Sequence, residues 1–321
     1  MGRYLLKKAG AAGLTMVFVL VLNFLIIHIA PGDPARILSG LDNPSPEVIE
    51  ALRQKYGLDK PLPVQLVTYF RQVLGGDLGY SIIYDMPVWA LIKERLGATL
   101  LLTFTSALVA FVLGSMLGAY SATKQGSRVD GVLSFVAYLL YSMPSFWLGL
   151  MLILVFASRL KILPTSGMTD LRAPQAGIFH YLDVLRHLVL PCSTLALIQI
   201  PAYYRITRAS VSGVLKEDFV TLFRASGMRE GKIFRKYALK NAILPTVTVF
   251  GLHLAYVVTG AALVEIVFAW PGMGRLMLGA IYRRDYPLLM GIYLIMSLSV
   301  AVTMVVVDIV YAILDPRIRY T

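Results

Sequence analysis

The chain has 321 residues, of which 57% are hydrophobic and only 15% are charged, and its mean hydropathy is +0.71. Soluble domains carry roughly 25% charged residues, so this composition excludes an ordinary water-soluble protein. The formal net charge of +12 is explained by a membrane topology and by anionic lipid headgroups, and it gives little support to nucleic-acid binding. The single cysteine, Cys192, excludes a disulfide within the chain.

Uncharged runs long enough to cross about 30 Å of hydrocarbon recur along the chain. Two prolines in the fourth run, Pro191 and Pro201, are tolerable because neighbouring helices satisfy the carbonyls that a proline frees. The first run is too long for a signal peptide and no small-residue cleavage site follows it, so we expect it to be retained. The predicted class is an all-α polytopic membrane protein with six transmembrane helices, in Ala9 to Ala30, Leu96 to Thr123, Gly131 to Ser158, His187 to Tyr204, Asn241 to Val264 and Tyr286 to Val307.

Lysines and arginines are unevenly divided among the loops. With the N-terminus inside, the cytoplasmic pieces carry 16 of the 30 basic residues in about 65 positions, against 14 in nearly twice that length outside. Both termini are therefore predicted to be cytoplasmic. The expected divisions are a tail with the first span (1–30), an extracytoplasmic helical loop (31–95) and a core of five spans (96–321) that contains a cytoplasmic loop (205–242).

The extracytoplasmic loop is expected to contain helices. Ser45, Pro46 and Glu47 have the pattern of an N-cap, a proline at the first helical position and an acidic first turn, and Gly57 would end that helix. A second helix is predicted from Pro63 to Leu74, and a third from Pro87 into the second span. About 65 residues make a small packed lid with no ligand of its own, rather than an independent domain.

The central loop, residues 205–242, is basic and amphipathic. Apolar residues recur at helical spacing from Val211 to Phe223, and Gly227 is expected to end that helix before a second amphipathic stretch around Tyr237. A solvated positive-inside loop does not need an apolar stripe, and a DNA-binding helix-turn-helix would need a folded domain of its own. The pattern favours a docking surface for a soluble partner.

A series of short strings in this order resembles the permease subunits of binding-protein-dependent ABC importers, in the peptide and nickel branch. They are Pro31-Gly32-Asp33-Pro34, Gly57-Leu58-Asp59-Lys60-Pro61, Gly76-Asp77-Leu78-Gly79, Ser142-Met143-Pro144-Ser145-Phe146-Trp147, Leu163-Pro164-Thr165-Ser166-Gly167, Asn241-Ala242-Ile243-Leu244-Pro245, Phe268-Ala269-Trp270-Pro271-Gly272-Met273-Gly274 and Asp315-Pro316-Arg317. The resemblance covers nearly the whole chain and implies a type I ABC importer permease fold.

The resemblance also implies that the central loop carries the "EAA" coupling motif, whose short helix fits a groove on the ATPase subunit. The family glycine corresponds to Gly227 and the closing Leu-Pro to Leu244-Pro245. The chain departs from the branch where small or polar residues usually precede the glycine, because it has Leu222 and Phe223 there. The implied coupling residues are Glu217, Asp218, Phe219, Leu222, Phe223, Arg224, Ala225 and Gly227.

No catalytic or metal motif is found in the sequence. The one Gly-Lys pair, Gly231-Lys232, lacks the preceding glycine and following Ser/Thr of a phosphate-binding loop. Paired cysteines, H-E-x-x-H and G-x-S-x-G are also missing, and the four histidines are scattered. We therefore expect no catalytic residue, no metal and no cofactor on this chain, with ATP and magnesium bound by partner ATPase subunits.

Two carboxylates and one aromatic string within the spans are candidates for the pathway. Asp308 is near the inner end of the last span, where snorkelling or pairing explains it. Glu265, near the outer end of the fifth span, is either interfacial or faces water or a gate. The string in the third span is either a packing and kink element or part of the pathway. The pathway candidates are Met143, Pro144, Phe146, Trp147 and Glu265.

The resemblance implies a permease subunit that forms half of the pathway of an ATP-driven importer for di- or oligopeptides, with nickel chelates or oligosaccharides as alternatives. The implied partners are a homologous permease, two ATP-binding subunits, an extracytoplasmic solute-binding protein and membrane lipid, in a bacterial or archaeal cytoplasmic membrane. A stand-alone secondary transporter is the competing class, but internal repeats and mid-membrane charges are not evident. An intramembrane enzyme lacks a nucleophile and base.

Overall fold

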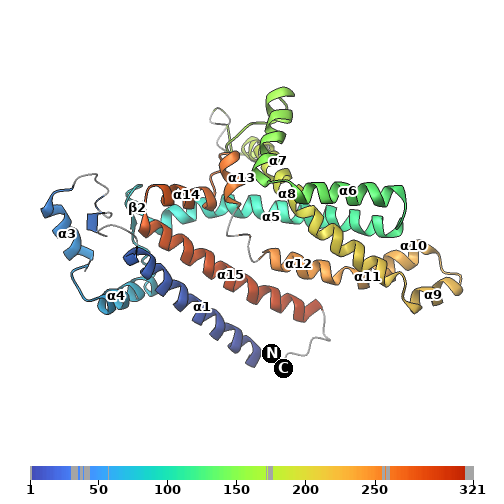
Figure 1. The fold of residues 1–321 in the computed structure, drawn as a ribbon, viewed down its shortest axis with the longest axis horizontal. Helices are drawn as coiled ribbons and strands as arrows, with labels where there is room; N and C mark the ends of the chain where they lie inside the picture. Colours follow the sequence, from blue (N-terminus) through green and yellow to red (C-terminus); the bar gives the residue numbers. More distant parts are fainter. Residues whose placement is uncertain are drawn as a thin grey trace. The chain divides into compact units, whose positions relative to one another are not determined.

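The computed structural model describes residues 2–29, 35–36, 39, 44–56, 58–170, 172, 176–254, 257 and 261–314. These residues are mostly helical, with one two-stranded hairpin (Figure 1). The longer elements are α1 (Gly2–Ile29), α3 (Pro46–Tyr56), α4 (Leu62–Leu74), β1 (Tyr80–Ser81), β2 (Met86–Pro87), α5 (Val88–Thr123), α6 (Arg128–Ser142), α7 (Ser145–Leu152), the π-helix η1 (Ile153–Arg159), α8 (Ile178–Val214), α9 (Asp218–Ala225), α12 (Leu244–Leu254), α13 (Ala262–Val267), α14 (Met273–Tyr282) and α15 (Tyr286–Leu314).

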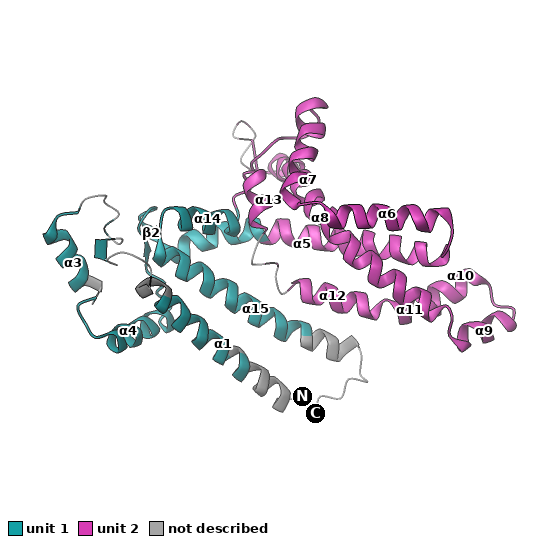
Figure 2. Cartoon of the chain, viewed as in Figure 1, with its two compact units in different colours: residues 1–99, 272–321 teal, residues 100–271 magenta. Residues whose placement is uncertain are grey.

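The chain divides into two compact units, residues 1–99 with 272–321 and residues 100–271 (Figure 2). In the first unit, the start of α5 packs against α14 and α15 through buried apolar residues that include Val88, Ile92 and Ile292. Asp285 is buried and accepts hydrogen bonds from Ser81 Oγ at 2.5 Å and from the Ile83 amide at 3.3 Å. This carboxylate therefore ties the hairpin to the start of α15.

In the second unit, α5 and α8 approach each other closely along a small-residue face of α5. A Cβ placed on Gly114 would lie 2.7 Å from Tyr203 Cβ, and one on Gly118 would lie 2.5 Å from the Tyr204 carbonyl oxygen. The two glycines form a G-x-x-x-G pattern, and such patterns allow helix backbones to meet inside membranes. Only glycine fits these two positions.

Helices α3, α4 and α5 begin within one residue of the predicted positions, and the Val48 amide donates to Ser45 Oγ at 3.4 Å as an N-cap requires. Gly57 lies outside the described residues. Local signals decide these helix starts because capping and proline geometry depend only on neighbouring residues.

The predicted third span, Gly131 to Ser158, is not one straight helix. It is divided into α6 and the α7–η1 pair, which are bent by 107° at Met143 and Pro144. Pro144 has no amide hydrogen to donate, and a residue before proline is disfavoured in helical geometry. Met143 accordingly takes an extended conformation with φ −79° and ψ 131°, so the string in the third span forms a kink, one of the roles predicted for it.

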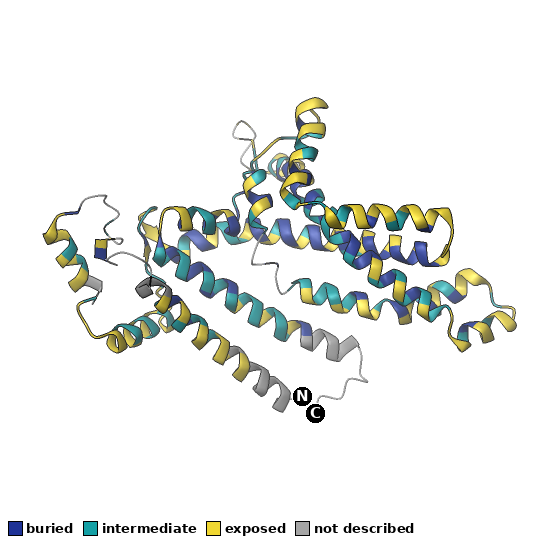
Figure 3. Cartoon of the chain, in the orientation of Figure 1, coloured by how far each residue is buried: buried dark blue, intermediate teal, exposed yellow. Residues whose placement is uncertain are grey.

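Within the described residues, three single helices are long and apolar enough to cross a membrane, α5, α8 and α15 over Tyr286–Val307, and the bent α6–α7–η1 pair makes a fourth. The first and fifth predicted spans contain the shorter apolar helices Gly13–Leu25 and Leu244–Leu254. Helix α8 contains Pro191 and Pro201 without ending at either. Many residues of these helices are exposed (Figure 3). A large share of them are apolar, as expected for surfaces that face lipid or another subunit.

Candidate functional site

In the first half of the central loop, a tight turn joins the end of α8 to α9. The predicted single helix from Val211 to Gly227 is wrong, because α8 ends at Val214 and α9 begins at Asp218. Glu217, between them, is extended with φ −70° and ψ 150°, and the Val220 amide bonds back to its carbonyl at 3.0 Å. Asp218 in the first turn places a negative charge at the N-terminus of α9, which favours a new helix start there.

Gly227 ends α9 as predicted. Its φ is +77°, and the Met228 amide donates to the Phe223 carbonyl at 3.1 Å, which is the six-to-one hydrogen bond of a glycine-terminated helix. The chain then continues through the helical segments α10 (Glu230–Lys232), the π-helix η2 (Ile233–Ala238) and α11 (Leu239–Ala242).

The apolar residues of α9 have different surroundings. Phe219 and Phe223 are half-buried, with ring centroids 5.9 Å apart, and Phe223 lies 4.4 Å from the ring of Tyr237. Val220 is fully buried, whereas Leu222 is 64% exposed. The aromatic rings therefore hold α9 against η2, and Leu222 is the large apolar side chain that α9 leaves open for a partner.

Charged residues flank this exposed leucine. Arg224 and Glu230 form an ion pair with Nε and Oε1 2.8 Å apart, and this contact holds the pKa of the Glu230 carboxyl below its ordinary value. The pair bridges α9 and α10 across Gly227. Of the predicted coupling residues, the structure exposes Glu217, Asp218, Leu222, Arg224, Ala225 and Gly227.

The pathway candidates occupy two neighbouring segments of the second unit. Met143 and Pro144 form the bend, and Phe146 and Trp147, at the start of α7, are 45% and 42% exposed. Glu265 is fully buried in α13.

Helices α7 and α13 meet where a Cβ on Gly149 would lie 3.1 Å from the ring of Phe268. The bend and the Glu265 helix are thus in contact through these two elements. The side chain of Asp308 lies outside the described residues.

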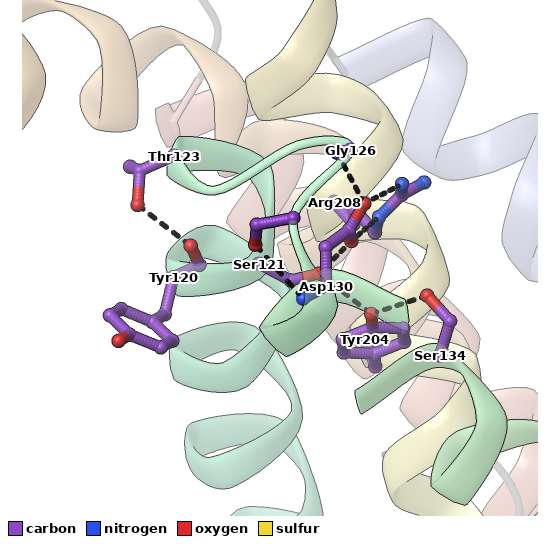
Figure 4. Close-up of polar contacts among 9 residues, drawn as sticks. Tyr120, Ser121, Thr123, Gly126, Asp130, Ser134, Tyr204 and Arg208 are labelled. Atoms are coloured by element: carbon purple, nitrogen blue, oxygen red, sulfur yellow. Dashed lines mark hydrogen bonds and ion pairs between the residues drawn. The ribbon is translucent and has the colours of Figure 1, made fainter. Parts of the chain in front are cut away.

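A polar cluster that the sequence did not reveal connects the end of α5, the start of α6 and α8 (Figure 4). Its members are Ser121, Asp130, Ser134, Tyr204 and Arg208, and we refer to it as the Asp130 cluster. Arg208 Nε donates to Asp130 Oδ1 at 2.7 Å and Nη2 donates to Oδ2 at 2.8 Å. In the sequence, Arg208 is one of many loop arginines and Asp130 resembles a helix-capping residue, so no local signal pairs them.

Comparison with known proteins identifies the family. Residues 112–320 match the family described as "Binding-protein-dependent transport system inner membrane component", and residues 1–103 match its N-terminal family. The dipeptide transport system permease protein DppB of Escherichia coli K12 is 34% identical, with 99% of both chains covered. The oligopeptide transport system permease protein AppB of Bacillus subtilis is also 34% identical over the whole of both chains.

A solved structure shares the fold. A chain in the inward-facing MetNI methionine ABC transporter superposes with a TM-score of 0.55 at 17% identity, covering 71% of this chain and 97% of that one. The sequence matches cover nearly all of the residues from 1 to 320. The chain therefore belongs to the binding-protein-dependent transport system inner membrane components, and it is a permease subunit of an ABC importer.

Proposed function

We propose that this chain forms half of a translocation pathway that carries di- or oligopeptides inward across a bacterial or archaeal cytoplasmic membrane. The observation that carries the proposal is the full-length similarity to permeases named for dipeptides and oligopeptides. The solute-binding protein of the system would select the peptide, and this chain would conduct it.

The proposed topology has six spans with both termini in the cytoplasm. The excess of basic residues in the short loops supports this orientation. Helices α1 and α15 give separate support, because Asn23 Nδ2, near the end of α1, donates to the Met290 carbonyl near the start of α15 at 3.3 Å. The two helices lie side by side along their length (Figure 1), so they run antiparallel, and the start of α1 and the end of α15 lie at the same end of the pair. This supports placing both termini on one side of the membrane, and the basic residues assign that side to the cytoplasm.

The proposed driving force is ATP hydrolysis on two partner subunits, since the sequence contains no phosphate-binding loop. Helix α9, with exposed Leu222 and the neighbouring Arg224–Glu230 pair, would dock on one ATPase and receive its movement. A homologous permease would complete the pathway, and a loaded binding protein would dock on the extracytoplasmic side. No cofactor is assigned to this chain, and no nucleic-acid partner is proposed.

The test is uptake by proteoliposomes that contain this chain, the partner permease, the ATPases and the solute-binding protein of the same system. We expect labelled di- and tripeptides to accumulate only with ATP and binding protein present. A non-hydrolysable ATP analogue is the control for energy coupling. Accumulation of nickel chelates or oligosaccharides, with no uptake of peptides, would contradict the proposed substrate class while leaving the importer assignment in place.

A further inference from the structure

The Asp130 cluster is held together by a continuous set of hydrogen bonds. The Asp130 carboxylate accepts both guanidinium bonds of Arg208, a bond from Ser121 Oγ at 2.5 Å and one from the Gly126 amide at 3.0 Å. The Tyr204 hydroxyl lies 2.7 Å from Ser121 Oγ and 2.9 Å from Ser134 Oγ. Figure 4 shows these side chains pointing toward one another from α5, α6 and α8.

This arrangement differs from a surface ion pair. The Asp130 side chain is 7% exposed and that of Arg208 is 31% exposed. A bidentate guanidinium–carboxylate pair fixes both distance and angle, and each further hydrogen bond restricts the carboxylate more. Removing one partner of a buried pair leaves an uncompensated charge, whereas removing both does not. The cluster therefore resists relative movement of the segments that it joins.

Along the chain, one member of the cluster, Arg208, is close to α9, and another, Asp130, is in the helix that leads to the bend. Helix α8 continues from Arg208 to Val214, and α9 begins after a three-residue turn. In the other direction, α6 continues from Asp130 to the bend at Met143 and Pro144.

A second contact, between apolar residues, holds the central loop against the ends of α5 and α8. Val211 of α8 and Ala242 of α11 are buried together with Ala119 and Ala122 at the end of α5. The end of α5, the end of α8 and the closing segment of the central loop thus pack together, and the cluster connects α6 to this packed group.

We propose that Asp130 and Arg208 are positioning residues for coupling, which make the start of α6 move as one body with the end of α5, with α8 and with the central loop. Movement of α9 by the ATPase is then delivered to the bent α6–α7 pair as well as to α8. The proposal rests on the proposed role of α9 as the ATPase contact.

The first test compares Asp130→Ala, Arg208→Ala and the double variant in the reconstituted transporter, with uptake and ATP hydrolysis measured together. We expect solute imported per ATP hydrolysed to fall by about 2- to 30-fold, the range of coupling changes produced by residues that touch neither ligand. The double variant should regain assembly and thermal stability, because no buried charge is left unpaired, but it should keep the low import per ATP. Arg128→Ala is the matched control and should import normally. Like Arg208→Ala it removes one positive charge, but at an exposed position in the first turn of α6, next to Asp130.

The second test measures movement directly, first with the cluster intact and then in the double variant. Spin labels at Arg128→Cys in α6 and Ala209→Cys in α8, in a Cys192→Ser background, report the distance between the two helices. We expect that distance to be the same with and without ATP and loaded binding protein, and to vary in the double variant. The distance measured with the intact cluster tests the proposal even if the cluster variants do not assemble.

Two results would overturn the proposal. One is wild-type import per ATP in the double variant, which would show that the pair only balances charge. The other is a label distance that changes with nucleotide in the intact cluster. Failure of the proposed function is a separate result, because it would appear as an absence of peptide uptake in the unmodified transporter.

Discussion

At the residue scale, Leu222 and Phe223 are adjacent in the chain but have different surroundings. Phe223 packs on Tyr237 inside the loop, and Leu222 is exposed. An apolar side chain at the centre of a docking surface contributes most when a partner covers it. Leu222 is therefore the better target for separating docking from folding of the loop.

We predict that Leu222→Glu leaves membrane insertion unchanged and weakens recruitment of the ATPase by at least ~10-fold, because the glutamate would be buried without a partner. Co-purification of the ATPase with the permease measures the effect. Asn241→Asp, which adds the same charge at another exposed position of the loop, should recruit normally. Undiminished recruitment by Leu222→Glu would show that α9 does not dock through this residue.

Gly118 gives a prediction about packing. Alanine normally favours a helix interior by about 1 kcal/mol over glycine, and Gly97→Ala, where a Cβ would meet nothing within 4 Å, should follow that rule. At Gly118, the added Cβ would meet backbone of α8 at 2.5 Å, and overpacking of this kind costs about 1–3 kcal/mol. Thermal unfolding in detergent should show a lower midpoint for Gly118→Ala only, and equal midpoints would mean that α5 and α8 do not touch there.

At the element scale, the bend between α6 and α7 and the break between α8 and α9 have different local causes but share one property. In each case, apolar periodicity continues through the junction while the backbone leaves helical geometry, at Met143 before Pro144 and at Glu217 before Asp218. Periodicity reports which residues are apolar, and local backbone geometry determines where a helix stops.

The orientation of the elements is testable by cysteine labelling in a Cys192→Ser background. We predict that Glu47→Cys in α3 reacts with an impermeant thiol reagent added outside cells, and that Lys232→Cys in α10 reacts only after permeabilisation. Both positions are exposed, so accessibility depends on the side of the membrane. Labelling of Glu47→Cys only from the cytoplasmic side would overturn the six-span topology.

At the scale of the whole molecule, the chain is one subunit of a transporter. Uphill transport requires coupling to a driving reaction, and the sequence contains no phosphate-binding loop for that reaction. We predict that the purified chain in vesicles neither hydrolyses ATP nor accumulates peptide, even under an imposed proton or sodium gradient. Gradient-driven accumulation by this chain alone, measured with labelled peptide, would contradict the subunit assignment.

The sequence by itself determined the membrane class, the positions of most helices, the glycine stop at Gly227 and the family, because these depend on composition, local capping and the order of short motifs. Only the tertiary structure decided that Phe223 packs inward while Leu222 is exposed, that Gly118 meets α8, and that Asp130 binds Arg208, 78 residues along the chain. Contacts between distant segments depend on how helices pack in three dimensions. Periodicity and local propensity contain no information about which partner a given face will meet.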